Sequence, residues 1–230
     1  MTDVGSVIEA ERARVSRPLY SYADADYLAD VSRGTSKRWI RGYQYWDVHG
    51  ERVVQPPITP GIDGQEAISF VDLVEIAAIG RLKEVGFSLK NIRRIVSNCQ
   101  ELLDVSRPLT TLKFKTDGRE IFVDQGDMLL EVGKRRGERA WNDFLGPFLD
   151  ELEYGTEFAR RWWPLGKGRP IFIDPDYGHG FPVIKDSGVR TEIILERFQA
   201  GDLHNQIAKD FNVSEIDVER ALQFELNRAA

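Results

Sequence analysis

The feature that most constrains this sequence is a basic face on one short helical segment. Arg33, Lys37, Arg38 and Arg41 lie within nine residues that contain no acidic residue. Arg33, Lys37 and Arg41 are spaced i, i+4 and i+8, so they share one face of a helix, and Arg38 stands beside them. Ser32 is a suitable N-cap for this helix. A basic stripe of this kind can bind phosphates even though the whole chain has a net charge of −6.

A short helical pattern precedes the basic segment, and a hairpin follows it. Apolar residues recur at helical spacing within residues 22–31, which completes the outline of a helix-turn-helix. Residues 43–48 then alternate toward a turn at His49-Gly50, and residues 52–54 return along it. This pattern predicts a small hairpin of the kind called a wing. We therefore expect a winged helix near the N-terminus.

Two longer helices are predicted after the wing. Ser69 caps the first, with Asp72 three residues on as an approximate capping box, and Gly86 ends it. Ser88 caps the second. The apolar residues of the second helix follow a regular three-four spacing: Leu89, Ile92, Val96, Cys99 and Leu103. We expect Cys99, the single cysteine, to be a small core residue on this stripe.

These segments together resemble a known family. The stretch VSRGTSKRWIRGY, the wing, and ISFVDLVEIAAIGRLKEVGFSLKNIRRIV are similar to the DNA-binding domain of MerR-type transcription regulators, over roughly residues 20–104. The resemblance implies that the basic residues of the second helix face DNA and that Arg52 on the wing contacts the DNA backbone. The alternative is a solvated basic face without DNA contact, which is what charge runs usually are.

Two positions depart from the MerR-type pattern. Ser36 stands where the family usually has a leucine, and this replacement is expected to weaken the anchoring of the helix. Ile40 replaces a usual acidic residue and is a candidate protein contact. The family's long dimerising coiled coil is also missing from residues 109–169. There, Asp117-Gly118 is a strong hairpin signal, because pairing outward from it gives two strands with one apolar face.

The remaining sequence is aromatic-rich and then acidic. Residues 141–163 are expected to be roughly helical. Residues 170–230 are predicted to form short strands at 171–173 and 182–184 followed by three helices, the last two at helix-turn-helix spacing. This segment holds 11 acidic and 6 basic residues, so the phosphates of nucleic acid would repel it. We expect a protein partner instead, bound by acids of the last helix: Glu215, Asp217, Glu219 and Glu225.

The C-terminal segment carries a second resemblance. IFIDPDYGHGFPVI, Arg190 and AKDFNVSEIDVERALQFE are similar to a small helical domain of VapB-like antitoxins, which are encoded beside PIN-domain ribonucleases. With the MerR-like head, the whole chain resembles a VapB-type antitoxin of a type II toxin–antitoxin system. The resemblance implies direct neutralisation of a PIN-domain (VapC-type) ribonuclease and autoregulation through operator DNA, bound as a homodimer. The alternative is a MerR-like transcription regulator controlled by a small effector.

Catalysis, cofactors and membranes are not expected. The chain has three histidines, none with a metal-ligand partner at a recognised spacing: His49, His179 and His204. Asp174 and Asp176 flank Pro175, which we interpret as a turn rather than a hydrolytic or metal site. The sequence also contains no nucleotide-binding loop. The lone cysteine, the polar N-terminus and the absence of an apolar run of ~18 residues predict a cytoplasmic, non-enzymatic protein.

The sequence therefore predicts a mainly α fold with small β hairpins in three parts. These are a winged-helix DNA-binding domain at residues 1–108, a hairpin-and-helix connector at 109–169, and a helical antitoxin-like domain at 170–230.

Overall fold

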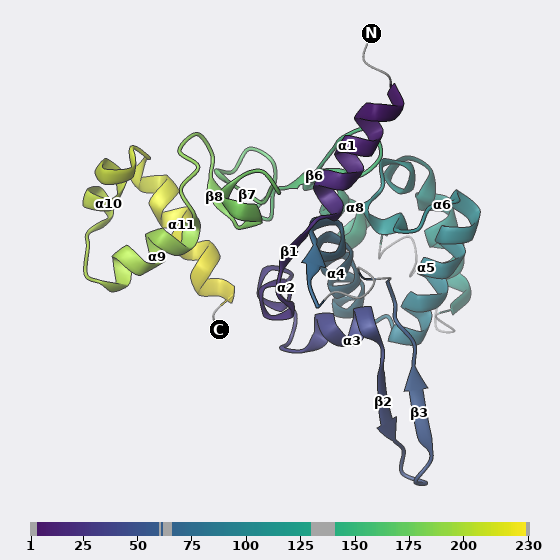
Figure 1. Ribbon diagram of the computed structural model, residues 1–230. Coiled ribbons are helices and arrows are strands. Elements are labelled where there is room, and N and C mark those ends of the chain that lie inside the picture. The colour runs from purple at the N-terminus through teal and green to yellow at the C-terminus, as the bar shows by residue number, and fades with distance from the viewer. Residues whose placement is uncertain (1–3, 60, 62–65, 130–140, 229–230) are drawn as a thin grey trace. The chain divides into compact units, whose positions relative to one another are not determined.

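The computed structural model describes residues 4–59, 61, 66–129 and 141–228 (Figure 1). As predicted, the fold is mainly α-helical with small antiparallel strand pairs. The chain divides into two compact units. The first comprises Met1–Leu149 with Tyr154–Ala159, and the second comprises Asp150–Glu153 with Arg160–Ala230. Residues 109–169, expected as a separate connector, are thus shared between the two units.

The first unit contains the expected winged helix and a helical body. Strand β1 pairs with β4 and β2 pairs with β3, both antiparallel. The elements, in chain order, are α1 (Val4–Ser16), β1 (Pro18–Tyr20), α2 (Tyr22–Leu28), α3 (Thr35–Arg41), β2 (Tyr43–Trp46), β3 (Arg52–Gln55), β4 (Ile68–Ser69), α4 (Phe70–Glu84), α5 (Leu89–Leu103), the 3-10 turn η1 (Pro108–Thr110), α6 (Leu112–Leu129), the π-helical turn η2 (Trp141–Leu145) and α8 (Gly146–Asp150).

Helix α4 is the centre of the first unit, since 12 of its 15 residues are buried. A helix buried on all sides must lie in a core. Its predicted cap is confirmed: the Ser69 hydroxyl accepts a hydrogen bond from the Asp72 amide, and the Asp72 carboxylate accepts one from the Ser69 amide. Helix α5 begins at the predicted Ser88 cap and buries the predicted stripe from Ile92 to Leu103, Cys99 included, whereas Leu89 is half-buried.

The predicted Asp117-Gly118 hairpin is wrong, because α6 runs through it as one helix from Leu112 to Leu129. The Thr111 hydroxyl caps this helix by accepting a hydrogen bond from the Phe114 amide. Phe114, Gly118 and Phe122 are spaced i, i+4 and i+8, so they share a helical face. The Phe114 and Phe122 rings both contact Trp141, at centroid distances of 5.5 and 5.7 Å.

Gly118 has a packing role on this face. A Cβ atom there would lie 2.3 Å from the Phe114 ring, so only glycine leaves room for the aromatic contact. Burial of these aromatic side chains outweighs the local turn preference of Asp-Gly, as tertiary packing often does. The glycine that signals a turn in the sequence is therefore a helix-packing residue.

The second unit is smaller and contains the predicted C-terminal helices. The aromatic-rich stretch is helical only as far as Asp150, after which it forms a hairpin. The elements after α8 are β5 (Leu152–Tyr154), β6 (Ala159–Trp162), β7 (Ile171–Phe172), the 3-10 turn η3 (Gly178–Gly180), β8 (Val183–Ile184), α9 (Thr191–Gln199), α10 (His204–Phe211) and α11 (Glu215–Arg228). Strand β5 pairs with β6 and β7 with β8, so the two predicted strands are confirmed as a pair.

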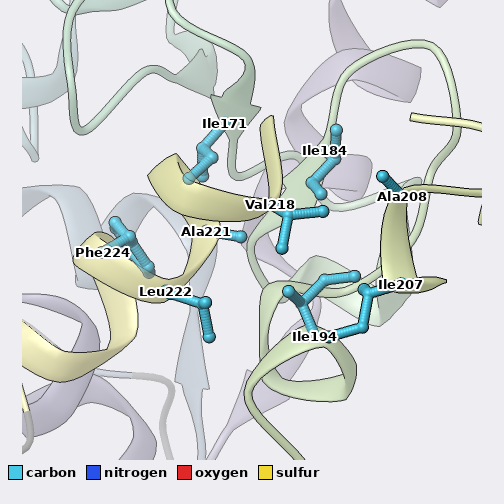
Figure 2. Close-up of a cluster of buried hydrophobic side chains, with 9 residues drawn as sticks. All are labelled: Ile171, Ile184, Ile194, Ile207, Ala208, Val218, Ala221, Leu222 and Phe224. Carbon is cyan, nitrogen blue, oxygen red and sulfur yellow. The ribbon is translucent and has the colours of Figure 1, made fainter. Parts of the chain in front are cut away.

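The core of the second unit lies between the β7–β8 pair and the three helices. Figure 2 shows apolar side chains from all five elements meeting there. Ile171 and Ile184 come from the strands, and Ile194, Ile207 and Phe224 come from the helices. This cluster gives the C-terminal helices a core of their own.

Candidate nucleic-acid interface and acidic helix surface

A buried carboxylate joins the two helices of the N-terminal helix-turn-helix. Asp26 on α2 is 5% exposed and accepts hydrogen bonds from the amides of Gly34 and Ser36, the latter at 2.7 Å. These amides are among those that the first turn of α3 leaves without helical partners. Asp26 thus caps α3 from the neighbouring helix and fixes the angle between the two.

The two departures from the MerR-type pattern are both buried residues of α3. Ser36 is fully buried, and its hydroxyl donates a 2.9 Å hydrogen bond to the Tyr22 carbonyl. A polar contact thus takes the place of the usual leucine, and the expected loss of anchoring at this position is offset. Ile40 is 3% exposed, so its assignment as a protein contact is wrong. Its side chain belongs to the core beside Trp39, which is buried as expected.

The basic residues predicted to face DNA are exposed. Lys37, Arg38 and Arg41 lie on α3, whereas Arg33 lies in the turn before it, because α3 begins at Thr35. Two of these cations meet at one tyrosine of α2. Arg41 Nε donates a 2.9 Å hydrogen bond to the Tyr22 hydroxyl, and Lys37 Nζ lies 5.5 Å from the centroid of the Tyr22 ring.

The wing is the β2–β3 hairpin, which projects from α3 (Figure 1). Arg52, predicted to contact the DNA backbone, is exposed, and its Nε donates a 2.8 Å hydrogen bond to Gln44 Oε1. Trp46 lies directly opposite Arg52 and is 72% exposed. The sequence reasoning did not single out Trp46. The alternating wing pattern could have indicated it, because Trp46 shares its face with Gln44.

A buried carboxylate lies in the core of the first unit. Glu75 on α4 is fully buried, and its Oε1 accepts a 2.9 Å hydrogen bond from the Leu109 amide. Burial raises the pKa of Glu75 to about 7, and Asp72 adds to the shift, whereas Arg107 and the Leu109 amide oppose it. Arg107 forms a 2.8 Å ion pair with Asp72. Burial and the nearby Glu75 also raise the pKa of Cys99 to about 12, consistent with a core thiol.

The four acids predicted to bind a partner have different environments on α11. Glu215 and Glu219 are exposed. Asp217 is half-buried, and its carboxylate accepts hydrogen bonds from the Ser214 amide and hydroxyl, which caps the helix. Glu225 is 4% exposed and bonds the Thr191 hydroxyl on α9, so its assignment to the partner surface is wrong. Its position next to Phe224 on the inner face of α11 explains its burial.

Apolar side chains that the sequence reasoning missed lie on the same three helices. Phe198, Leu203 and Ile216 are 41%, 64% and 65% exposed. A hollow of about 330 Å³ is lined by Phe198, Leu203, Glu215 and their neighbours. Exposed aromatic and aliphatic groups beside charge are typical of protein-binding surfaces. Helical spacing does not reveal this exposure for Phe198 and Leu203, because each lies four residues from a buried isoleucine, Ile194 or Ile207.

The Asp-Pro segment is a turn, as interpreted. Asp174 is buried, forms a 3.0 Å ion pair with Arg161, and accepts a hydrogen bond from the Asp176 amide. The Tyr177 amide closes the turn on the Asp174 carbonyl. Within the residues that the structure describes, no group of three His, Cys, Asp or Glu side chains is placed to hold a metal ion. In the same part of the chain, no helix is long and apolar enough to cross a membrane.

Comparisons with known proteins agree with this division of the chain. Residues 18–96 match a family described as a putative DNA-binding HTH domain, and residues 171–224 match a family described as a protein of unknown function, DUF433. The first match covers α2, α3 and the wing. These matches support a DNA-binding regulator.

Two mycobacterial proteins are similar over most of the chain. The uncharacterized protein Rv2308 of Mycobacterium tuberculosis is 23% identical over an aligned length of 224 residues, and the alignment covers 91% of this chain and 91% of the relative. The crystal structure of Rv2018 from Mycobacterium tuberculosis superposes with a TM-score of 0.69 at 22% identity. It covers 90% of this chain and 98% of its own. The fold is therefore shared along nearly the full length.

Proposed function

We propose that this protein is the antitoxin of a type II toxin–antitoxin module. Its first unit binds the operator of its own operon, as a homodimer on a palindrome, and its second unit neutralises a PIN-domain ribonuclease by direct contact. The observation that carries the proposal is the pairing of two units with opposite surfaces. One presents a basic α3 beside a wing, and the other presents acids and apolar side chains on α9, α10 and α11.

The surface chemistry of the second unit supports protein binding over nucleic-acid binding. Glu215 and Glu219 would repel phosphates, because phosphate charge dominates nucleic-acid affinity. The neighbouring Leu203 and Ile216 offer apolar area that a protein partner can bury. A ribonuclease needs a basic surface for its RNA, and such a surface is complementary to these acids. The chain itself is proposed to have no catalytic activity and no cofactor.

Neutralisation of the proposed ribonuclease partner tests the proposal. That PIN-domain ribonuclease is titrated with full-length protein, and RNA cleavage is measured. We expect cleavage to stop near a fixed molar ratio. The double variant Glu215→Lys/Glu219→Lys should neutralise more weakly than Glu84→Lys/Glu101→Lys, which makes the same change in charge at exposed sites of the first unit. If the ribonuclease cleaves RNA undiminished in the presence of the wild-type protein, the antitoxin function is excluded.

An effector-controlled regulator is the second candidate. A hollow of about 470 Å³ in the first unit, lined by Asp104, Leu112, Lys113, Glu157 and their neighbours, has the volume of a small-molecule site. Its lining is more polar than most such sites, which favours the antitoxin. Saturable binding of a small molecule that changes DNA affinity would support this second function.

A further inference from the structure

We propose that Trp46 on the wing enters the minor groove of bound DNA, beside the major groove that α3 occupies. The inference rests on the DNA-binding half of the proposed function. It adds a contact that differs from the phosphate contacts of the basic residues, because an indole ring packs against bases and sugars rather than phosphate charge.

The exposure of Trp46 is the first observation. It is 72% exposed, whereas the other four tryptophans are at most 8% exposed. The apolar side chains of Val48 and Val54 are also exposed on this hairpin, at 95% and 60%. A large apolar group held in water on a projecting element is typical of a contact site.

The second observation is the chemistry of the wing face. Trp46 pairs with Arg52 and Gln44 pairs with Val54, so these four side chains share one face of the hairpin. Arg and Gln are residues that read the minor groove, and apolar side chains are the wedges that proteins insert there. The acids of the wing, Asp47 and Glu51, lie at its turn, where the Asp47 carboxylate accepts hydrogen bonds from the backbone.

Chain length places Trp46 at the correct distance from α3. Four residues, 42–45, separate it from Arg41 at the end of that helix, so five backbone steps join the two. At about 3.3 Å per extended residue they span at most about 16 Å. One turn of DNA measures about 34 Å, so the minor groove lies about 17 Å along the axis from the neighbouring major groove. The backbone span is close to that distance, and the Trp46 side chain extends beyond the backbone, so with α3 in the major groove the indole ring is within reach of the next minor groove.

The base of the wing is hydrogen-bonded to both α5 and α3. Arg93 on α5 donates hydrogen bonds to Gln55 Oε1 at 3.1 Å and to the Pro56 carbonyl at 3.0 Å. The Ile58 amide donates a 2.7 Å hydrogen bond to the Trp39 carbonyl on α3. Because the base of the hairpin is tied at both points, little ordering is needed for binding.

Fluorescence quenching tests whether DNA covers Trp46. The probe is a duplex that the wild-type protein enriches from a random-sequence pool. In the free protein, acrylamide should quench the fluorescence of Trp46, and this quenchable fluorescence should be missing from Trp46→Phe because the other tryptophans are buried. Saturating duplex should remove most of this quenching.

Affinity measurements then separate the indole contact from phosphate contacts. Trp46→Ala should weaken binding about tenfold or more, while the slope of log affinity against log salt stays unchanged. Arg41→Ala should lower that slope by about 0.9. Tyr45→Ala, on the opposite face of the same strand, should weaken binding by about threefold or less. Inosine in place of guanine should raise affinity at positions half a turn from α3, because it removes the amino group from the minor groove.

Several outcomes would overturn the inference. If Trp46 stays fully quenchable in the saturated complex, DNA does not cover it, although DNA binding itself stands. If shielding needs no DNA and grows with protein concentration, a second copy of the chain covers the wing instead. If wild-type protein enriches no duplex, the DNA-binding half of the proposed function fails, and the inference with it.

Discussion

The chain contains two helix-turn-helix pairs that differ in charge and in what holds them together. In α2–α3 a buried carboxylate, Asp26, caps the second helix across the joint. In α10–α11 the joint is apolar, with Ile207, Ala208 and Val218 in the common core (Figure 2). The outer surface of α3 is basic, and that of α11 carries Glu215 and Glu219. The comparison shows that the same local shape can be built by different interactions and can carry opposite surface charge.

Truncation of the second core should have the largest effect on this comparison. Phe224→Ala removes a fully buried ring from the α9–α11 cluster and should destabilise the second unit by about 3–5 kcal/mol. DNA affinity at low temperature should be unchanged, because the first unit has its own core. Segment-resolved hydrogen exchange measures the stability of each unit, and fluorescence anisotropy of a labelled duplex measures the DNA affinity. A parallel loss of protection in α4 would show that the units are not separate.

Removal of the basic face should have the next largest effect. Lys37→Ala/Arg38→Ala/Arg41→Ala should lower DNA affinity by about a hundredfold or more, and should lower the salt slope by about 2.7 if each cation neutralises one phosphate. Lys83→Ala/Lys90→Ala/Arg94→Ala, which removes three exposed cations of α4 and α5, is the matched control. Equal losses in the two variants would mean that net charge matters and that α3 has no special role.

The buried acid of the first unit predicts a dependence on pH. Glu75 has a higher pKa folded than unfolded, so its contribution to stability is complete below about 4.5 and is lost as the pH rises to about 7. Relative to Glu75→Gln, the unfolding free energy of the wild type should therefore fall by about 3 kcal/mol between pH 4 and pH 8. Denaturant titrations at several pH values measure it. A constant difference would show that burial does not perturb Glu75.

The smallest predicted effect concerns the polar joint. Asp26→Ala leaves the amides of Gly34 and Ser36 without their acceptor and should destabilise the first unit by about 2 kcal/mol. Asp26→Asn keeps one acceptor oxygen and should cost less. Thermal unfolding compares the two variants. If both melt like wild type, the carboxylate does not hold the joint.

Local signals in the sequence predicted most helices and strands, but they failed where long-range packing decides the structure. The capping pair Ser69–Asp72 and the wing follow from short-range rules, and the structure contains both. The Asp117-Gly118 hairpin was wrong because Phe114 and Phe122 pack against a distant residue, Trp141. No local pattern shows that contact.

The candidate site was predicted unevenly for a similar reason. Arg41 on the basic helix and Arg52 on the wing are both exposed, as a residue that contacts DNA must be. Glu225 was misplaced because its buried partner, Thr191, lies 34 residues away. Trp46 was not predicted, because the predicted site rested on charge, although its alternation with Gln44 along the wing strand indicates a shared face.

One experiment tests directly the claim that the two units serve different partners. RNA cleavage by the PIN-domain ribonuclease proposed as the partner and DNA binding are measured side by side for two full-length variants, Lys37→Ala/Arg38→Ala/Arg41→Ala and Glu215→Lys/Glu219→Lys. The account predicts that the first loses DNA binding and still neutralises, and that the second keeps DNA binding and neutralises poorly. Loss of both activities in either variant, with the fold intact, would contradict it.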